Sequence, residues 1–151
     1  MSYFHCGKFL LKTLFVMENY ATPHFPTHIL NYISSEEMIG IRAGKKHETF
    51  IEIWMVTIGE RVFARSWRLS ERSWFTTFMK IPLGDICCLG EIIPVTALIV
   101  GNQDTLLTAA INQAYNRKYN HGDDSYYVNQ MIDPTRWERT IELRPRQLVY
   151  C

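Results

Sequence analysis

Hydrophobic and polar residues alternate from residue 51 to residue 67, in two runs separated by Gly59 and Glu60. Alternation with a period of two predicts β-strands, and glycine as the first of two loop residues is what a type II′ hairpin turn requires. This turn fixes which residues face each other across the hairpin. The expected pairs are Ile58 with Arg61, Val56 with Phe63, Trp54 with Arg65, and Glu52 with Trp67.

The two faces of this hairpin differ in chemistry. One face is expected to form the interior of a sheet or barrel, and it carries Ile51, Ile53, Met55, Val62, Ala64 and Ser66. The other face places Arg65 opposite Trp54, and a guanidinium over an indole gains about 0.5 to 2 kcal/mol. Two interpretations of this pair stay open: a packing contact on a covered surface, or a site for an anion or a flat ring.

Together with the two strands of the hairpin, the rest of the chain predicts a helix, five strands, a second helix and a closing strand. We expect helices over residues 26–34 and 103–119, the latter capped by Asp104 or Asn102. Outside the hairpin, strands are expected over residues 38–43, 85–89, 92–100 and 140–143, with Gly90 and Glu91 as the turn between the middle two. Residues 68–80 are expected to form a short helix or a wrapped loop, and residues 126–132 a further helical turn.

Strands joined by hairpins, with helices at the ends of the order, indicate an antiparallel α+β barrel and not a parallel sheet. We expect one such domain over residues 23–151. Residues 1–22 match no later pattern and are expected to be an N-terminal extension.

Composition narrows the possible partners and the compartment. Sixteen basic and 15 acidic residues give a formal charge of +1, so the basic excess typical of nucleic-acid binding is missing. The apolar run 9–17 is interrupted by Lys12 and is too short to span a bilayer, so no membrane partner is expected. The four cysteines lack C-x-x-C spacing, which favours free thiols in a reducing, cytoplasmic setting.

Motifs for self-sufficient catalysis are absent from the sequence. It contains no G-x-S-x-G, H-E-x-x-H, P-loop or Rossmann glycine pattern. An enzyme built on this chain would therefore need a cofactor to supply the chemistry. The turn Gly44-Lys45-Lys46-His47 is either a cradle for a phosphate or a solvated loop tip.

Several segments together carry a resemblance: Met38-Ile39-Gly40-Ile41-Arg42, Ile53-Trp54-Met55-Val56, residues 62–67, Ala114-Tyr115-Asn116-Arg117-Lys118-Tyr119, and residues 140–145. In order and spacing, the chain after residue 22 resembles the bacterial family called domain of unknown function 2255. That family is similar to the FMN-binding split barrels, which include pyridoxamine 5′-phosphate oxidase-like proteins and deazaflavin-dependent nitroreductases. The resemblance implies a six-stranded antiparallel split β-barrel with flanking helices.

The resemblance also implies a cofactor site. A glycine followed by basic residues before the second strand binds the cofactor phosphate in the deazaflavin-dependent group, and Lys45 and Lys46 fall there. Ser66 and Trp74 match positions that contact the cofactor region. We expect Lys45, Lys46 and Arg65 to neutralise a phosphate while Trp54 or Trp74 stacks on a ring.

This expectation makes the protein an FMN-binding or deazaflavin-binding oxidoreductase. The sequence departs from the deazaflavin-dependent group at His47-Glu48, where Ser-Gly is expected, and at Trp67-Arg68, where Gly-Gly is expected. Trp67 and Arg68 would narrow the groove. The alternative is therefore a non-catalytic module that binds another small ligand.

Aromatic residues outside the expected barrel interior point to assembly. They are Phe63, Trp67, Trp74, Phe75 and Phe78. Large aromatic patches on soluble proteins are usually covered, and dimer interfaces favour such residues. The sequence therefore predicts a homodimer.

Overall fold

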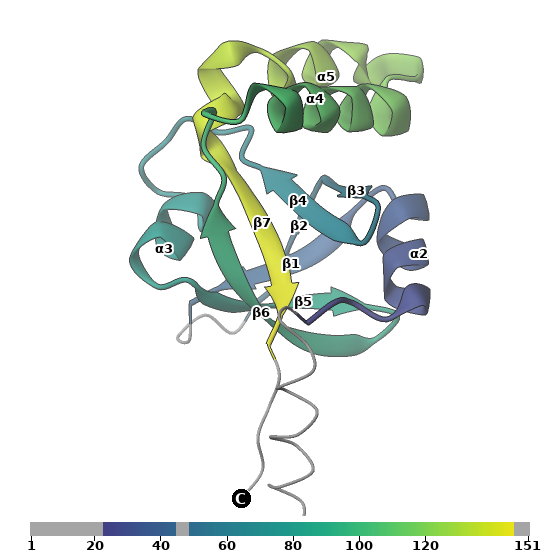
Figure 1. Ribbon diagram of the computed structural model, residues 1–151, viewed down its shortest axis with the longest axis vertical. Coiled ribbons are helices and arrows are strands. Elements are labelled where there is room, and N and C mark those ends of the chain that lie inside the picture. The colour runs from purple at the N-terminus through teal and green to yellow at the C-terminus, as the bar shows by residue number, and fades with distance from the viewer. Residues whose placement is uncertain (1–22, 45–48, 147–151) are drawn as a thin grey trace, which may run out of the picture.

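A computed structural model describes residues 23–44 and 49–146 of the 151-residue chain. It shows an α+β fold in which seven antiparallel strands form a nearly closed barrel, with helices around it (Figure 1). The strands are β1 (Ile39–Ala43), β2 (Ile51–Ile53), β3 (Met55–Ile58), β4 (Arg61–Arg65), β5 (Leu83–Cys88), β6 (Glu91–Ile99) and β7 (Thr140–Pro145). The α-helices are α2 (Thr27–Ser35), α3 (Trp74–Lys80), α4 (Thr105–Tyr119) and α5 (Ser125–Met131), and the 3-10 helices are η2 (Gly122–Asp124) and η3 (Pro134–Arg139).

The barrel is closed by one strand that is broken at Trp54. The sheet order is β2-β1-β5-β6-β7-β4-β3, so β2 and β3 lie at its two edges although only Trp54 separates them in the chain. The first half pairs with β1 and the second half with β4. The expected α+β barrel is thus confirmed, and the break at Trp54 explains why seven strands replace the expected six.

The hairpin turn at Gly59 forms as expected, but its register holds only near the turn. Gly59 has φ +60°, and Ile58 pairs with Arg61 and Val56 with Phe63. The expected pairs of Trp54 with Arg65 and Glu52 with Trp67 are wrong, because the chain leaves the ladder at Trp54. Glu52 pairs with Gly40, and Arg65 pairs with Thr140.

Both faces of the hairpin are covered within the chain. Met55, Val62 and Ala64 lie in the barrel core, as the alternation predicted. Val56 and Phe63, on the other face, pack in a second cluster against α4 and α5. The expectation for the start of the first run was wrong, since Ile51 is exposed. Covering both faces removes apolar area from water on each side of a strand pair, at about 25 cal/mol per Å².

The turn between β5 and β6 lies one residue earlier than expected. Leu89 and Gly90 form it, with φ +54° and +75°, and Cys88 pairs with Glu91. Positive φ at both central residues is the type I′ geometry. The sequence predicted Gly90 and Glu91 as the turn residues instead, and a leucine rarely adopts the backbone conformation seen at Leu89.

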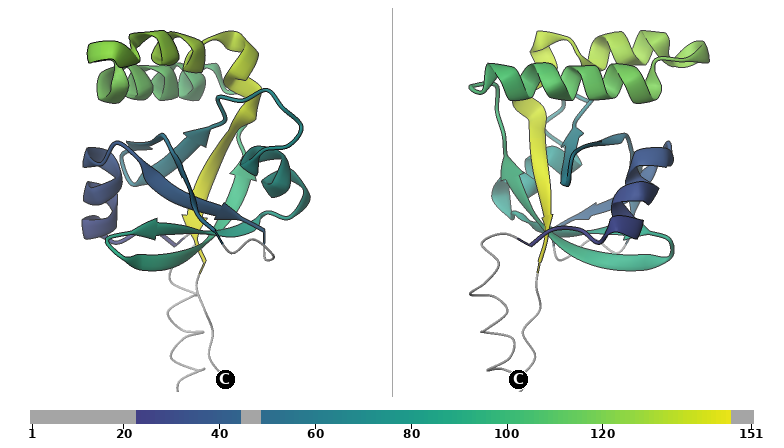
Figure 2. Two further views of the ribbon diagram at one scale, coloured as in Figure 1. Left: turned by 180° about the vertical axis from the view of Figure 1, so that it is seen from behind. Right: turned by 45° about the vertical axis from the view of Figure 1, so that its right-hand side comes forward.

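The helices cover the ends and sides of the barrel. Helices α4 and α5 lie side by side across one end, whereas α2 and α3 lie on opposite sides (Figures 1 and 2). The side chain of Asp104, one of the two expected caps, accepts a hydrogen bond from the backbone N–H of Leu107 at the start of α4. Residues 68–80, left open as helix or loop, contain α3, which Ser73 and Thr76 begin with a reciprocal capping box. No helix in the described ranges is long and apolar enough to cross a membrane.

Most of the aromatic residues that were expected to need a second subunit are covered within one chain. Phe75 and Phe78 of α3 point into the barrel core, and Phe63 lies under α4, so all three are buried within one chain. Trp74 is partly buried against the same core. Trp67 keeps 39% of its surface exposed. The homodimer itself stays a prediction without this support.

Candidate functional site

A cavity of about 620 Å³ opens where the broken strand, the end of β4, the start of α3 and α5 meet. Five of the seven residues proposed from the sequence line this cavity: Trp54, Arg65, Ser66, Trp67 and Trp74. The remaining two, Lys45 and Lys46, lie outside the described residues. The fold therefore brings together side chains from the break between β2 and β3, the end of β4 and the start of α3. The sequence suggested these residues but did not show that they lie in one cavity.

Arg65 is the most buried charged residue of the cavity wall, with 2% of its surface exposed. Its Nε donates to Thr140 Oγ1 at 2.7 Å, and its Nη1 donates to Asn112 Oδ1 at 2.6 Å and to the Met131 carbonyl at 3.0 Å. These partners come from β7, α4 and α5. Among the described residues, no hydrogen bond is formed by Nη2, the remaining nitrogen of the guanidinium.

The charge of Arg65 is held by neutral groups. No carboxylate in the described ranges forms an ion pair with it, although Glu52 and Asp124 also line the cavity. Burial lowers the pKa of Arg65, while electrostatic interaction with Tyr115 works in the opposite direction. A buried cation normally has a partner of opposite charge, because desolvation costs several kcal/mol per ion. Within the described ranges, the partners of the Arg65 guanidinium are neutral groups, and it lines an open cavity.

Trp54 contacts a tyrosine and not the expected arginine. Its indole stacks on Tyr119 of α4, with ring centroids 4.2 Å apart and planes inclined by 8°. The guanidinium of Arg65 instead lies 5.8 Å from the ring centre of Tyr115, whose hydroxyl accepts a hydrogen bond from the Arg65 backbone N–H at 2.8 Å. One face of the Trp54 indole is thus covered by α4.

Ser66 and Trp67 are already bound to neighbouring groups. The Ser66 hydroxyl donates to the carbonyl of Arg68 at 3.0 Å. The Trp67 indole N–H donates to Gln130 Oε1 at 2.6 Å, and the guanidinium of Arg136 lies 5.8 Å from its ring centre. Trp67 is therefore fixed against the helical layer and shapes the cavity, whereas Ser66 stabilises the turn after β4.

Trp74 lies between two cavities. Its ring makes edge contacts with Phe75 and Phe78, each at 6.3 Å between centroids. A second cavity, of about 470 Å³, extends on its other side along α3 and β1. The two cavities share Ile51, Arg72, Ser73 and Trp74.

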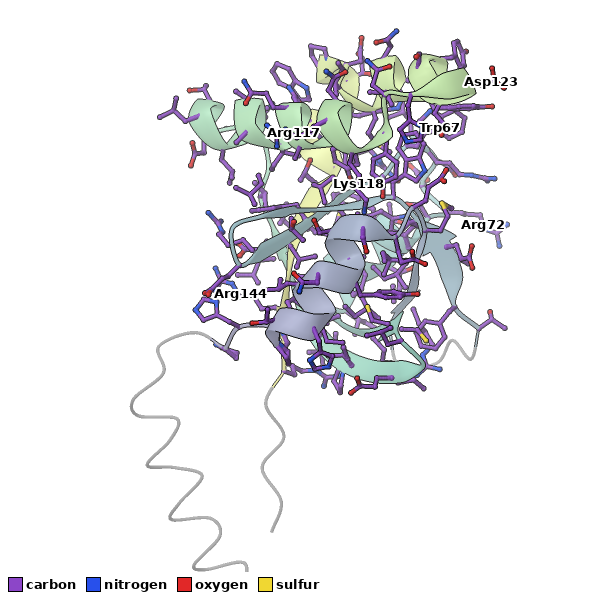
Figure 3. The ribbon with its side chains drawn as sticks, turned by 90° about the vertical axis from the view of Figure 1, so that its right-hand side faces the viewer. Trp67, Arg72, Arg117, Lys118, Asp123 and Arg144 are labelled. Carbon is purple, nitrogen blue, oxygen red and sulfur yellow. The ribbon has the colours of Figure 1, made fainter. Side chains whose placement is uncertain are left out.

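Two arginines at the site were not among the binding residues proposed from the sequence, although Arg68 was expected to narrow the groove. Arg68 and Arg72 line the first cavity and are exposed, and Figure 3 shows Arg72 at the side of the molecule below Trp67. Three arginines within eight residues, starting at Arg65, were the signal that could have found them. The residues that hold Arg65 carry no such signal. Among the described residues, no group of three or more His, Cys, Asp or Glu side chains is arranged to hold a metal ion.

A family model for uncharacterised proteins conserved in bacteria, DUF2255, matches residues 30–143, about three quarters of the chain. The chain belongs to the DUF2255 family. No functionally curated protein is significantly similar to it.

The DUF2255 chain is similar in fold to the crystal structure of a conserved hypothetical protein, Rv2991 from Mycobacterium tuberculosis. The two are 13% identical over 85% of each chain, with a TM-score of 0.50. At this identity the likeness concerns the fold alone. The function of the cavity between the DUF2255 barrel, α3 and α5 therefore has to be inferred from the side chains that line it.

Proposed function

We propose that the cavity binds a planar ligand with negative charge, that FMN is the first candidate and a deazaflavin the second, and that the bound cofactor makes the protein an oxidoreductase. The proposal places the DUF2255 chain among the FMN-binding split barrels. It rests on one observation: Arg65 is a buried guanidinium without a carboxylate partner in the described ranges, and it lines an indole-rich cavity.

The residues present fit such a ligand in size and chemistry. A volume of about 620 Å³ lies within the range of about 300 to 1,000 Å³ that is usual for small-molecule sites. Trp54, Trp67 and Trp74 supply flat apolar walls. Three arginines against two carboxylates give the lining a positive balance, and guanidinium groups bind phosphate and carboxylate oxygens well.

In this proposal a flavin would supply the electron or hydride transfer when bound. The chain's own residues bind and orient it. Arg65 donates to an acceptor atom inside the cavity, and the indoles exclude water from the ring. One side is closed by Trp67, which contacts Gln130 of α5 and Arg136 of η3.

Binding of FMN can be measured from the quenching of tryptophan fluorescence, together with the visible absorbance of the purified protein. We expect Arg72→Ala to weaken FMN binding about tenfold, because a hydrogen bond to a charged group contributes about 1.5 to 3 kcal/mol. Arg117→Ala is the matched control, since Arg117 is an exposed arginine of α4 outside both cavities. A protein without bound chromophore and without quenching up to about millimolar FMN would refute the proposal.

A second candidate is a non-catalytic module that binds a smaller anionic metabolite. Trp67 and its contacts with Gln130 and Arg136 favour it, because a fixed indole in the wall limits the room for a three-ring system. A thermal-shift screen of small aromatic acids and phosphates would identify such a ligand. Stabilisation by one of these compounds, with no shift from FMN, would favour this module over a flavoprotein.

The homodimer expected from the sequence also remains a proposal. Light scattering at micromolar concentration tests it directly against the 17.7 kDa mass of a single chain. A monomer would place the whole ligand site within one chain.

A further inference from the structure

The three arginines of the cavity lie at different depths. Arg65 has 2% of its surface exposed, whereas Arg68 and Arg72 are exposed. Figure 3 shows Arg72 reaching out at the side of the molecule. A ligand that fills the cavity therefore meets one cation at its inner end and two at the mouth.

The inner arginine has little hydrogen-bonding capacity left. A guanidinium carries five N–H donors, one on Nε and two on each Nη. Nε binds Thr140, and Nη1 binds both Asn112 and the Met131 carbonyl. Only the two N–H groups of Nη2 remain without a partner among the described residues, so Arg65 cannot present the side-by-side pair of nitrogens that grips a phosphate.

A phosphate group fits poorly at this inner position. It carries a charge of about −1.5 to −2 and three strong acceptor oxygens. Placing it beside Arg65 would bury most of that charge against a single nitrogen, and unpaired buried charge is costly. A single oxygen atom, such as a ring carbonyl, needs only one or two donors, and Nη2 supplies these. The same phosphate at the mouth would keep contact with water and meet two exposed guanidinium groups.

We propose that the ligand enters ring first, that Arg65 Nη2 donates to one oxygen on the ring, and that the phosphate stays at the mouth with Arg68 and Arg72. This inference rests on the proposed function and defines the orientation of the ligand in that site. It replaces the expectation from the sequence that Arg65 neutralises the phosphate. The burial that lowers the pKa of Arg65 adds to the argument, because a desolvated cation gains most from a fixed acceptor.

Two ligands that differ only in the phosphate separate the two ends of the site. FMN carries the phosphate, and riboflavin has the same ring system without it. Both can be titrated against wild type, Arg68→Ala, Arg72→Ala, Arg65→Gln and the control Arg117→Ala. The ratio of the two affinities in each variant measures whether the altered residue interacts with the phosphate.

We expect Arg68→Ala and Arg72→Ala each to weaken FMN about tenfold and to leave riboflavin within twofold. Arg65→Gln should weaken both ligands by the same factor, about tenfold, and Arg117→Ala should change neither. The two mouth variants concern exposed side chains and are expected to fold. They therefore decide the inference even if circular dichroism shows that Arg65→Gln is unfolded.

Opposite patterns overturn the orientation. If Arg65→Gln weakens FMN and spares riboflavin, or if the mouth variants leave FMN binding unchanged, the phosphate does not lie where we place it. Failure of the proposed function looks different, because neither FMN nor riboflavin would then bind the wild-type protein at about millimolar concentration.

Discussion

The two ends of β4 hold the same side chain in opposite ways. Arg61, the first residue of the strand, binds Glu142 through two nitrogens, at 2.9 and 3.1 Å, and its hydrogen bond to Glu142 raises its pKa. Arg65, the last residue, binds only neutral acceptors, and burial lowers its pKa. About half of the Arg61 side chain is exposed, whereas Arg65 is buried.

This contrast teaches that an arginine's role is set by its surroundings across the sheet. Arg61 and Arg65 are four residues apart, so they point to the same face of β4. On β7, Glu142 supplies a carboxylate to the first, and Thr140 supplies a hydroxyl to the second. The charge of Arg61, at the start of β4, is thus neutralised by a carboxylate of the same chain. The charge of Arg65, at the end of β4 that lines the cavity, is left for an external acceptor.

The largest effect is expected from removing the cation at the cavity end. Arg65→Met keeps much of the volume but leaves Thr140, Asn112 and the Met131 carbonyl without their donor. We expect the free energy of unfolding to fall by about 3 kcal/mol, measured by urea denaturation. The control Arg117→Ala should stay within about 0.5 kcal/mol of wild type. If Arg65→Met were as stable as wild type, the hydrogen bonds of the Arg65 guanidinium would not stabilise the fold.

A smaller loss of stability should follow from weakening the contacts of α4 with the rest of the fold. The Tyr119 hydroxyl donates to the Glu37 carbonyl at 2.7 Å and accepts from the Met55 N–H at 3.0 Å. Tyr119→Phe keeps the ring stacked on Trp54 and removes both bonds, at a cost of about 2 kcal/mol in urea denaturation. Tyr126→Phe, at an exposed tyrosine, provides the comparison, and equal losses in both variants would contradict the prediction.

Removing the ion pairs of Glu142 at the start of β4 should lower the free energy of unfolding by less, and the loss should depend on pH. Burial alone would raise the pKa of Glu142, but hydrogen bonds from Arg61 and Arg144 outweigh it and lower that pKa. We expect Glu142→Gln to lose about 1 kcal/mol at neutral pH, because both arginines stay partly solvated.

The sign of the pH dependence follows from this lowered pKa. Ionised Glu142 stabilises the folded state above the ordinary glutamate value of 4.5, and the contribution is lost as the pH falls through the folded pKa. Urea denaturation of wild type and Glu142→Gln should therefore converge below pH 4.5. Glu138→Gln, at an exposed glutamate, is the comparison variant and should stay within about 0.5 kcal/mol of wild type at neutral pH.

The smallest effect is expected at Lys118, a cation that, unlike Arg65, can be titrated. Lys118 of α4 donates to the Ile33 and Met55 carbonyls at 2.5 and 2.6 Å, and Figure 3 shows it between α4 and α2. Burial lowers the pKa of Lys118 to about 8, although Glu36 and Glu37 oppose this shift.

An unfolded lysine has a pKa of about 10.5, so between pH 8 and 10.5 the unfolded chain binds more protons than the folded one. The stability of wild type relative to Lys118→Met should therefore rise with pH in this range, by less than about 1 kcal/mol in total, because solvent screens the charge of this partly buried ammonium group. Parallel curves of stability against pH for wild type and Lys118→Met in urea denaturation would show that Lys118 is not desolvated.

Candidate residues were easier to predict than their roles. The alternation around Gly59 and the family resemblance singled out Trp54, Arg65 and Trp67, and the structure brings these residues to one cavity. The pairs of Trp54 with Arg65 and of Glu52 with Trp67 were wrong, because the sequence was interpreted as one continuous hairpin. Because the strand breaks at Trp54, the residues of β2 pair with β1 and not with β4. No local pattern in the sequence indicates that break.

The sequence by itself determined the local elements: the turn at Gly59, the alternating strands, and the long helix that starts after Asp104. Each depends on backbone conformation and on side chains close in the chain, which the order of residues specifies directly. Only the tertiary structure decided that β2 and β3 close a barrel, that α3 buries its own phenylalanines, and that Arg65 is a buried cation facing a cavity. The partners of Arg65 lie 47 to 75 residues away. Such contacts depend on how the strands and α4 pack together, so their chemistry emerges only when the whole chain is folded.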